Sequence, residues 1–110
     1  MNRIMVVNSE QIAGKKITHH LGLVRGNTIR ARHIGKDILA GLRNIVGGEI
    51  HEYTKLMAES REQAIDRMLD EATALGANAV VSVRFSTSMI SQGAAELLVF
   101  GTAVKYEDLE

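Results

Sequence analysis

A long amphipathic segment constrains the fold of this 110-residue chain more than any other part of the sequence. Between Ile50 and Leu75, apolar residues recur at the spacing of one helix face. The face consists of Met57, Ala64, Ile65, Met68, Ala72 and Leu75. At the standard rise per residue this helix would measure about 39 Å. Gly76 is the expected C-terminal cap, whereas Ser60 with Gln63 resembles a capping box and leaves open a break near Ser60.

The segments on either side of this helix carry the patterns of strands. Two N-terminal strands are expected, over 4–7 and 17–29, joined by a turn around 13–16, with a bulge at a glycine of the second strand. After Gly76, residues 79–86 alternate, with Ala79, Val81, Val83 and Phe85 on one apolar face. The last strand, about 95–105, is apolar on both faces, so it needs cover on both sides.

A second, short helix is predicted over 37–46, where Gly47 and Gly48 stop it. The sequence contains no internal repeat, low-complexity tract or linker. We therefore predict one α+β domain over residues 1–110, with a sheet packed on the long helix.

Three segments resemble the YbjQ-like family: Leu39–Gly48, Leu75–Val81 and Gly101–Val104. The resemblance extends over about Ile17 to Lys105 and implies a dodecin-subunit-like fold that assembles as a ring, with five copies expected. It also implies a heavy-metal-binding role, the label that this family carries without an established chemistry.

Composition excludes several classes of function. Thirteen basic residues balance thirteen acidic ones, so no net field attracts nucleic acid or an anionic membrane. There is no cysteine, which removes thiolate metal sites and thiol nucleophiles. No signal-peptide pattern or membrane span is apparent, so we expect a cytoplasmic protein. Aromatic residues make up only 4%, and an aliphatic core this small favours a homo-oligomer.

The histidines His19, His20, His33 and His51 are the candidate metal ligands. None of them stands in a chelating spacing such as HxH or HxxxH, and the adjacent pair His19 and His20 would point to opposite faces of a strand. A hydrogen-bonded structural histidine is the alternative for His19, and a site shared between subunits stays open.

The charged residues of the long helix can be interpreted either as structural or as ligand-binding residues. Arg61 projects into the apolar face, so we expect a salt bridge there, within the domain or between subunits, or an anion site at an interface. Glu59, Glu62, Asp66 and Asp70 share the opposite arc, where a solvated face is favoured over a cation site. Structural or interface roles are thus assigned to Arg61, Gly47, Gly48 and Gly76.

No catalytic residue set can be proposed from spacing, so the sequence does not predict an enzyme. The favoured function is an oligomeric binding protein that holds a metal ion or small ligand at subunit interfaces, with no cofactor identified. The alternatives are an enzyme whose site assembles between subunits and a purely structural interaction module.

Overall fold

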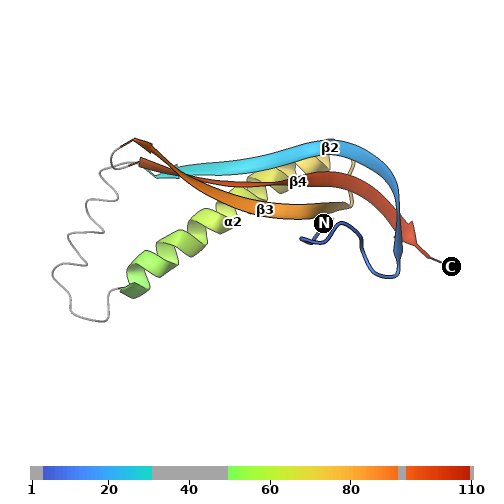
Figure 1. The fold of residues 1–110 in the computed structure, drawn as a ribbon, viewed down its shortest axis with the longest axis horizontal. Coiled ribbons are helices and arrows are strands. Elements are labelled where there is room, and N and C mark those ends of the chain that lie inside the picture. Colours follow the sequence, from blue (N-terminus) through green and yellow to red (C-terminus); the bar gives the residue numbers. More distant parts are fainter. Residues whose placement is uncertain (1–3, 31–49, 92–93, 110) are drawn as a thin grey trace.

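A mixed sheet with a long helix on one face makes up the described part of the chain. The computed structural model describes residues 4–30, 50–91 and 94–109. In chain order the elements are β1 (Met5–Val6), β2 (Lys15–Arg30), α2 (Ile50–Ala74), β3 (Ala79–Ser91) and β4 (Ala94–Asp108). The strands form a four-stranded sheet in the order β1-β3-β4-β2, where β1 is parallel to β3 and the other pairs are antiparallel. Figure 1 shows α2 against this sheet, and the predicted α+β class is confirmed.

Several predicted features lie outside the described residues. These are the short helix over 37–46, its stop at Gly47 and Gly48, and the candidate ligand His33. His51 belongs to the first turn of α2, but its side chain is outside the described set.

The long strand β2 contains the predicted bulge. Its pairing with β4 shifts register between Ile17 and His19, and again between His20 and Gly22. Gly22 has a φ of 127°, a region that residues with a side chain rarely adopt. The irregularity lets a strand of 16 residues bend, as the blue ribbon shows in Figure 1.

Helix α2 is continuous across Ser60, so the alternative of a break there is wrong. It ends where the sequence predicted. The amide of Ala77 donates to the carbonyl of Ala72 at 3.0 Å, and that of Gly76 donates to Thr73 at 3.0 Å. With a φ of 84° at Gly76, these bonds form a Schellman motif. Among the described residues, no helix is long and apolar enough to cross a membrane.

The main core lies between α2 and the sheet and is aliphatic. Its buried members are Val24, Ala64, Met68, Ala72, Val80, Val83, Val99 and Ala103. Helix α2 lies mostly over β2 and β4 and touches β3 only at its margin. Phe85 of β3 faces the helix side, opposite Val99. Because α2 covers so little of β3, Phe85 is still 48% exposed.

A second, smaller cluster lies on the other face of the sheet, under the segment that follows β1. Its buried members are Ile12, Ala79, Val81 and Val104, with Met5, Val7, Ile17 and Tyr106 packed around them. The N-terminal segment thus serves as a partial cover for one end of this face.

The rest of this second face carries apolar side chains that the single chain leaves accessible. Alternate residues of a strand, and residues directly opposed on antiparallel strands, share a face. Leu23, Ile29, Leu98 and Phe100 therefore lie on this face, together with the polar residues directly opposite them, Thr102, Glu96, Asn27 and Arg25. Leu23 is 64% exposed and Ile29 is 55% exposed, whereas Leu98 and Phe100 are half-buried. We call these four residues the open face. The last strand is therefore apolar on both sides, as predicted, but away from the helix only its Val104 end is buried within one chain, beneath the N-terminal segment.

Gly26 allows α2 to approach the backbone of β2 directly. A Cβ atom added to Gly26 would lie 2.0 Å from the carbonyl oxygen of Ala64 and 2.5 Å from the amide nitrogen of Met68. One helical turn before Ala64, the carbonyl of Ser60 accepts a hydrogen bond from the hydroxyl of Thr28 at 3.5 Å, and both residues are buried. Small residues, and not large interlocking side chains, set this contact.

Two side chains of α2 form hydrogen bonds with backbone groups at the outer edge of β2. The amide of Arg25 donates to Oε1 of Glu71 at 3.0 Å. Nη1 of Arg67 donates to the carbonyl of Asn27 at 2.5 Å. An edge strand with free N–H and C=O groups is a template for pairing with another chain, so these contacts block the part of the edge around Arg25 and Asn27.

The double variant Arg67→Ala, Glu71→Ala should therefore associate more readily than the native protein. Both lost hydrogen bonds are exposed, so the fold should lose only about 1 kcal/mol. Light scattering over a concentration series measures the association. The control, Glu62→Gln with Asp66→Asn, changes exposed carboxylates of the same helix away from the edge. Equal association of both variants would show that the edge needs no protection.

Candidate functional site

Of the four candidate histidines, His19 and His20 have described side chains. They lie opposite consecutive residues of β4, Lys105 and Val104, and both are exposed. Nδ1 of His19 is 3.0 Å from the hydroxyl of Thr18, a local hydrogen bond. Within the described residues, no three side chains of His, Asp or Glu are grouped to hold a metal ion. His19 and His20 therefore do not form a metal centre with other side chains of this part of one chain.

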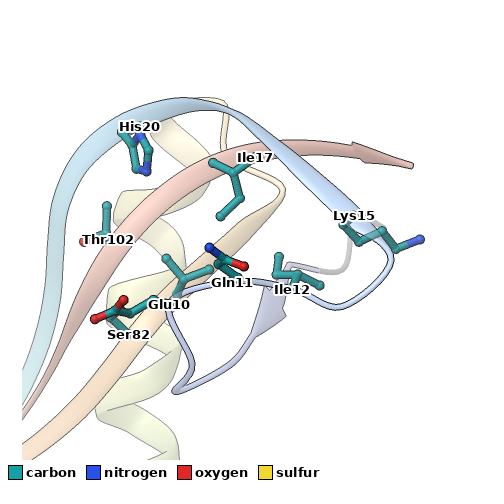
Figure 2. A pocket seen from close by; sticks show the side chains of 9 residues that line it. Glu10, Gln11, Ile12, Lys15, Ile17, His20, Ser82 and Thr102 are labelled. Atoms are coloured by element: carbon teal, nitrogen blue, oxygen red, sulfur yellow. The ribbon is translucent and has the colours of Figure 1, made fainter. Parts of the chain in front are cut away.

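His20 instead lines a pocket of about 510 Å³ between the N-terminal segment and the sheet. Figure 2 shows the pocket, in which side chains from four parts of the chain converge. The segment after β1 contributes Glu10, Gln11 and Ile12, strand β2 contributes Lys15, Ile17 and His20, β3 contributes Val81 and Ser82, and β4 contributes Thr102. Carboxylate, imidazole, amide and hydroxyl groups thus surround a small aliphatic floor.

Ser82 occupies an unusual backbone conformation at this pocket. Its φ is 57°, and among the described residues it is the one non-glycine position with a positive φ. The pairing of β3 with β4 shifts register between Val81 and Arg84, so Ser82 lies in a bulge. Bulges of this kind re-aim side chains next to binding sites. Here the bulge places the Ser82 side chain at the pocket.

The same bulge corrects the predicted alternation of residues 79–86. Ala79 and Val81 belong to the cluster on the pocket side, but Val83 belongs to the core under α2. One extra residue in the strand reverses the direction of every later side chain. The prediction of one apolar face through Val83 was therefore wrong.

Hydrogen bonds tie the N-terminal segment of the pocket to β3. The amide of Ser82 donates to the carbonyl of Ser9 at 2.9 Å, and Nη1 of Arg84 donates to that of Asn8 at 2.8 Å. The hydroxyl of Ser9 donates to the carbonyl of Gln11 at 2.6 Å. These bonds fix the backbone on both sides of Glu10. The pocket is therefore preformed in the single chain.

The charge of Lys15 is used outside the pocket. Its ammonium forms an ion pair with Asp108, and Figure 2 shows the end of the side chain turned away from the cavity. The hydrogen bond and the negative charge of Asp108 raise the pKa of Lys15. Lys15 thus lines the pocket mainly with its aliphatic stem.

Arg61, predicted to lie in the apolar face of the helix, is exposed in the single chain. The buried positions are Ser60, Ala64, Met68 and Ala72. The small side chain of Ser60 fits where the helix meets β2, so the buried side of α2 includes Ser60 in place of Arg61. Arg61 consequently lies at the surface. Arg61 is thus not buried within one chain, and its salt bridge or interface role stays a prediction. The carboxylates Glu59, Glu62, Asp66 and Asp70 are exposed, as expected of a solvated face.

Sequence reasoning singled out His20 but missed Glu10, Ser82 and Thr102. No spacing connects these residues, because the pocket forms only when the N-terminal segment folds back across three strands. The sole local signal was the unbroken apolar and small run from Ala79 to Val83, which is compatible with a bulge but does not require one.

Comparison with known proteins places the chain in a family. A family model described as "Putative heavy-metal-binding", YbjQ_1, matches residues 4–107. The chain belongs to this family. A UPF0145 protein of Dehalococcoides mccartyi is 60% identical over 104 residues, which cover 94% of this chain and all of that protein. A UPF0145 protein of Methanosarcina acetivorans is 56% identical over 102 residues, which cover 93% of this chain and 96% of the relative.

One solved structure supports the fold. The crystal structure of a protein of unknown function of the DUF74 family, from Pediococcus pentosaceus, matches with a TM-score of 0.61. The alignment covers 94% of this chain and 98% of that chain, at 11% sequence identity. At this identity the similarity extends to the fold alone.

Proposed function

We propose that this member of the YbjQ family is a homo-oligomeric binding protein that holds a small polar organic molecule in the pocket between the N-terminal segment and the sheet. The observation that carries the proposal is the convergence of Glu10, His20, Ser82 and Thr102 on one cavity from four separate parts of the chain. Polar groups brought together over an aliphatic floor are the usual composition of a small-molecule site.

The size of the pocket supports an organic ligand over a bare ion. Small-molecule sites range from roughly 300 to 1,000 Å³, and this pocket measures about 510 Å³. Its backbone is held in place before binding by the bonds of Asn8 and Ser9 to β3. Preformed sites lose less free energy to ordering when the ligand binds.

Self-association is part of the proposal, and the open face supports it. Leu23 and Ile29 lie beside half-buried Leu98 and Phe100 on a sheet face that the single chain leaves accessible. Apolar patches of this kind mark association surfaces in soluble proteins. The resemblance to the family adds the expectation of a dodecin-like ring with five copies, and we place its activity in the cytoplasm.

Metal binding is the second candidate. It is supported by the description of the family and by the presence of His20 and Glu10 in one pocket. Imidazole nitrogen and carboxylate oxygen are both ligands of zinc and similar ions. These two residues would need further ligands from a second copy or from a bound molecule, because the described part of one chain groups no three such side chains.

Native mass spectrometry and elemental analysis of protein purified without an affinity tag distinguish the two candidates. We expect an organic adduct in the mass spectrum and less than one metal ion per chain. The variant Thr102→Phe fills the pocket and should lose the adduct, whereas Thr87→Phe, at an exposed position of β3 outside the pocket, should retain it. Stoichiometric metal without an organic adduct would favour the second candidate. An adduct that persists in Thr102→Phe would contradict this location.

A further inference from the structure

The formal charge of the pocket depends on one carboxylate. Glu10 and Lys15 are the lining residues of fixed opposite charge. Lys15 is paired with Asp108 outside the cavity, and its ammonium lies 5.8 Å from the centroid of the Tyr106 ring. Its positive charge is therefore already compensated. The carboxylate of Glu10 is left as the group that sets the sign of the field in the pocket.

The position of Glu10 is determined by its neighbours. Asn8 and Ser9 are bonded to β3 on one side of it, and on the other side Ile12 is buried against Val81 and Val104. The carbonyl of Ile12 also accepts the amide of Lys15 at 3.1 Å, which closes the turn into β2. A charge held on an ordered backbone gives more selective recognition than one on a loose loop.

The remaining polar groups of the lining are suited to a ligand that combines hydrogen-bonding groups with a short apolar part. The side chains of Gln11, Ser82 and Thr102 can each donate and accept hydrogen bonds. Ile12, Ile17 and Val81 supply the apolar floor. None of these groups favours an anion over a cation. His20 also lines the pocket, and a positive charge on its imidazole would oppose a cationic ligand.

We propose that the pocket selects a small organic cation, such as a primary amine or guanidinium compound, which the carboxylate of Glu10 recognises while its apolar part lies on Ile12, Ile17 and Val81. The inference rests on the proposed function, because it assigns a ligand class to the same site.

Three probes with one carbon skeleton test this charge preference: benzylamine, benzyl alcohol and benzoate. Binding is followed through the amide chemical shifts of Ser82 and Thr102 in nitrogen-15 NMR spectra at pH 8. We expect benzylamine to bind about tenfold more tightly than benzoate, with benzyl alcohol between them. Glu10→Gln should remove this preference, whereas Glu107→Gln should preserve it, since Glu107 is an exposed carboxylate of β4 outside the pocket lining.

The outcomes separate the ligand class from the site. Benzoate binding as tightly as benzylamine, or a preference that survives Glu10→Gln, would overturn the cation assignment and leave the pocket intact as a binding site. If none of the probes shifts Ser82 or Thr102 and the purified protein carries no organic adduct, the proposed function fails together with this inference.

Discussion

Alanine in place of Gly26 should destabilise the protein by about 3 kcal/mol or more, the largest effect we expect of any single methyl group. The added Cβ would lie 2.0 Å from the carbonyl oxygen of Ala64 and 2.5 Å from the amide nitrogen of Met68. Both atoms belong to the backbone of α2, so no side-chain rotation relieves the overlap. The helix must move away from β2 and leave space around Met68, which is fully buried. Urea denaturation followed by circular dichroism measures the loss.

Gly14→Ala is the matched control for this prediction. Its Cβ would meet nothing within 4 Å, but its φ of 76° is unfavourable for alanine. We expect a cost of about 1 kcal/mol there, from backbone conformation alone. A Gly26→Ala protein no less stable than the control would mean that α2 does not approach β2 as closely as described.

Aspartate in place of Leu23 should dissociate the proposed oligomer while leaving the fold of each chain intact. Leu23 is 64% exposed in the single chain, so its replacement removes little buried area from the fold. In an assembly that covers the open face, the same change buries an unpaired charge and should weaken association by about a hundredfold or more. Aspartate at Leu98 or Phe100 should act in the same direction, although these half-buried side chains also contribute to the fold. Multi-angle light scattering on a sizing column measures the molecular mass.

Leu75→Asp provides the control for surface charge and lost apolar area. Leu75 is 46% exposed and lies at the end of α2, away from the open face. It should leave the oligomer unchanged. A native protein that is monomeric at micromolar concentration would contradict the proposed self-association. If Leu23→Asp and Leu75→Asp both dissociate the oligomer, the open face is not the specific surface of association.

The helix could be predicted with near-correct bounds because its determinants are local. The 3.6-residue period and the glycine cap act within a few residues of one another, and α2 spans Ile50–Ala74 with the predicted conformation at Gly76. The strand at Ile17–Ile29 and its glycine bulge were predictable for the same reason, although the strand extends to Lys15–Arg30. β3 and β4 likewise continue to Ser91 and Asp108, beyond the predicted ends, because pairing between strands supports residues whose own pattern is weak.

Arg61 shows where periodicity was insufficient. The helical pattern gives the apolar side of a helix to within about one residue, whereas burial depends on which side chain fits the opposing surface. At the crossing with β2 the fit is between Gly26 and small residues of the helix, and this selects Ser60 over Arg61 for the buried position.

By itself the sequence determined the α+β class, the length and cap of the helix, and the two apolar sides of the last strand. Only the tertiary structure decided the pocket. Its residues Glu10, His20, Ser82 and Thr102 lie on four segments that meet because β1 pairs parallel to β3 and the following loop crosses the sheet. The physical reason is that periodicity and capping are interactions between neighbours in the chain. A site assembled by a strand bulge and a returning loop depends instead on contacts between residues up to about ninety positions apart. Such contacts leave no characteristic spacing in the sequence.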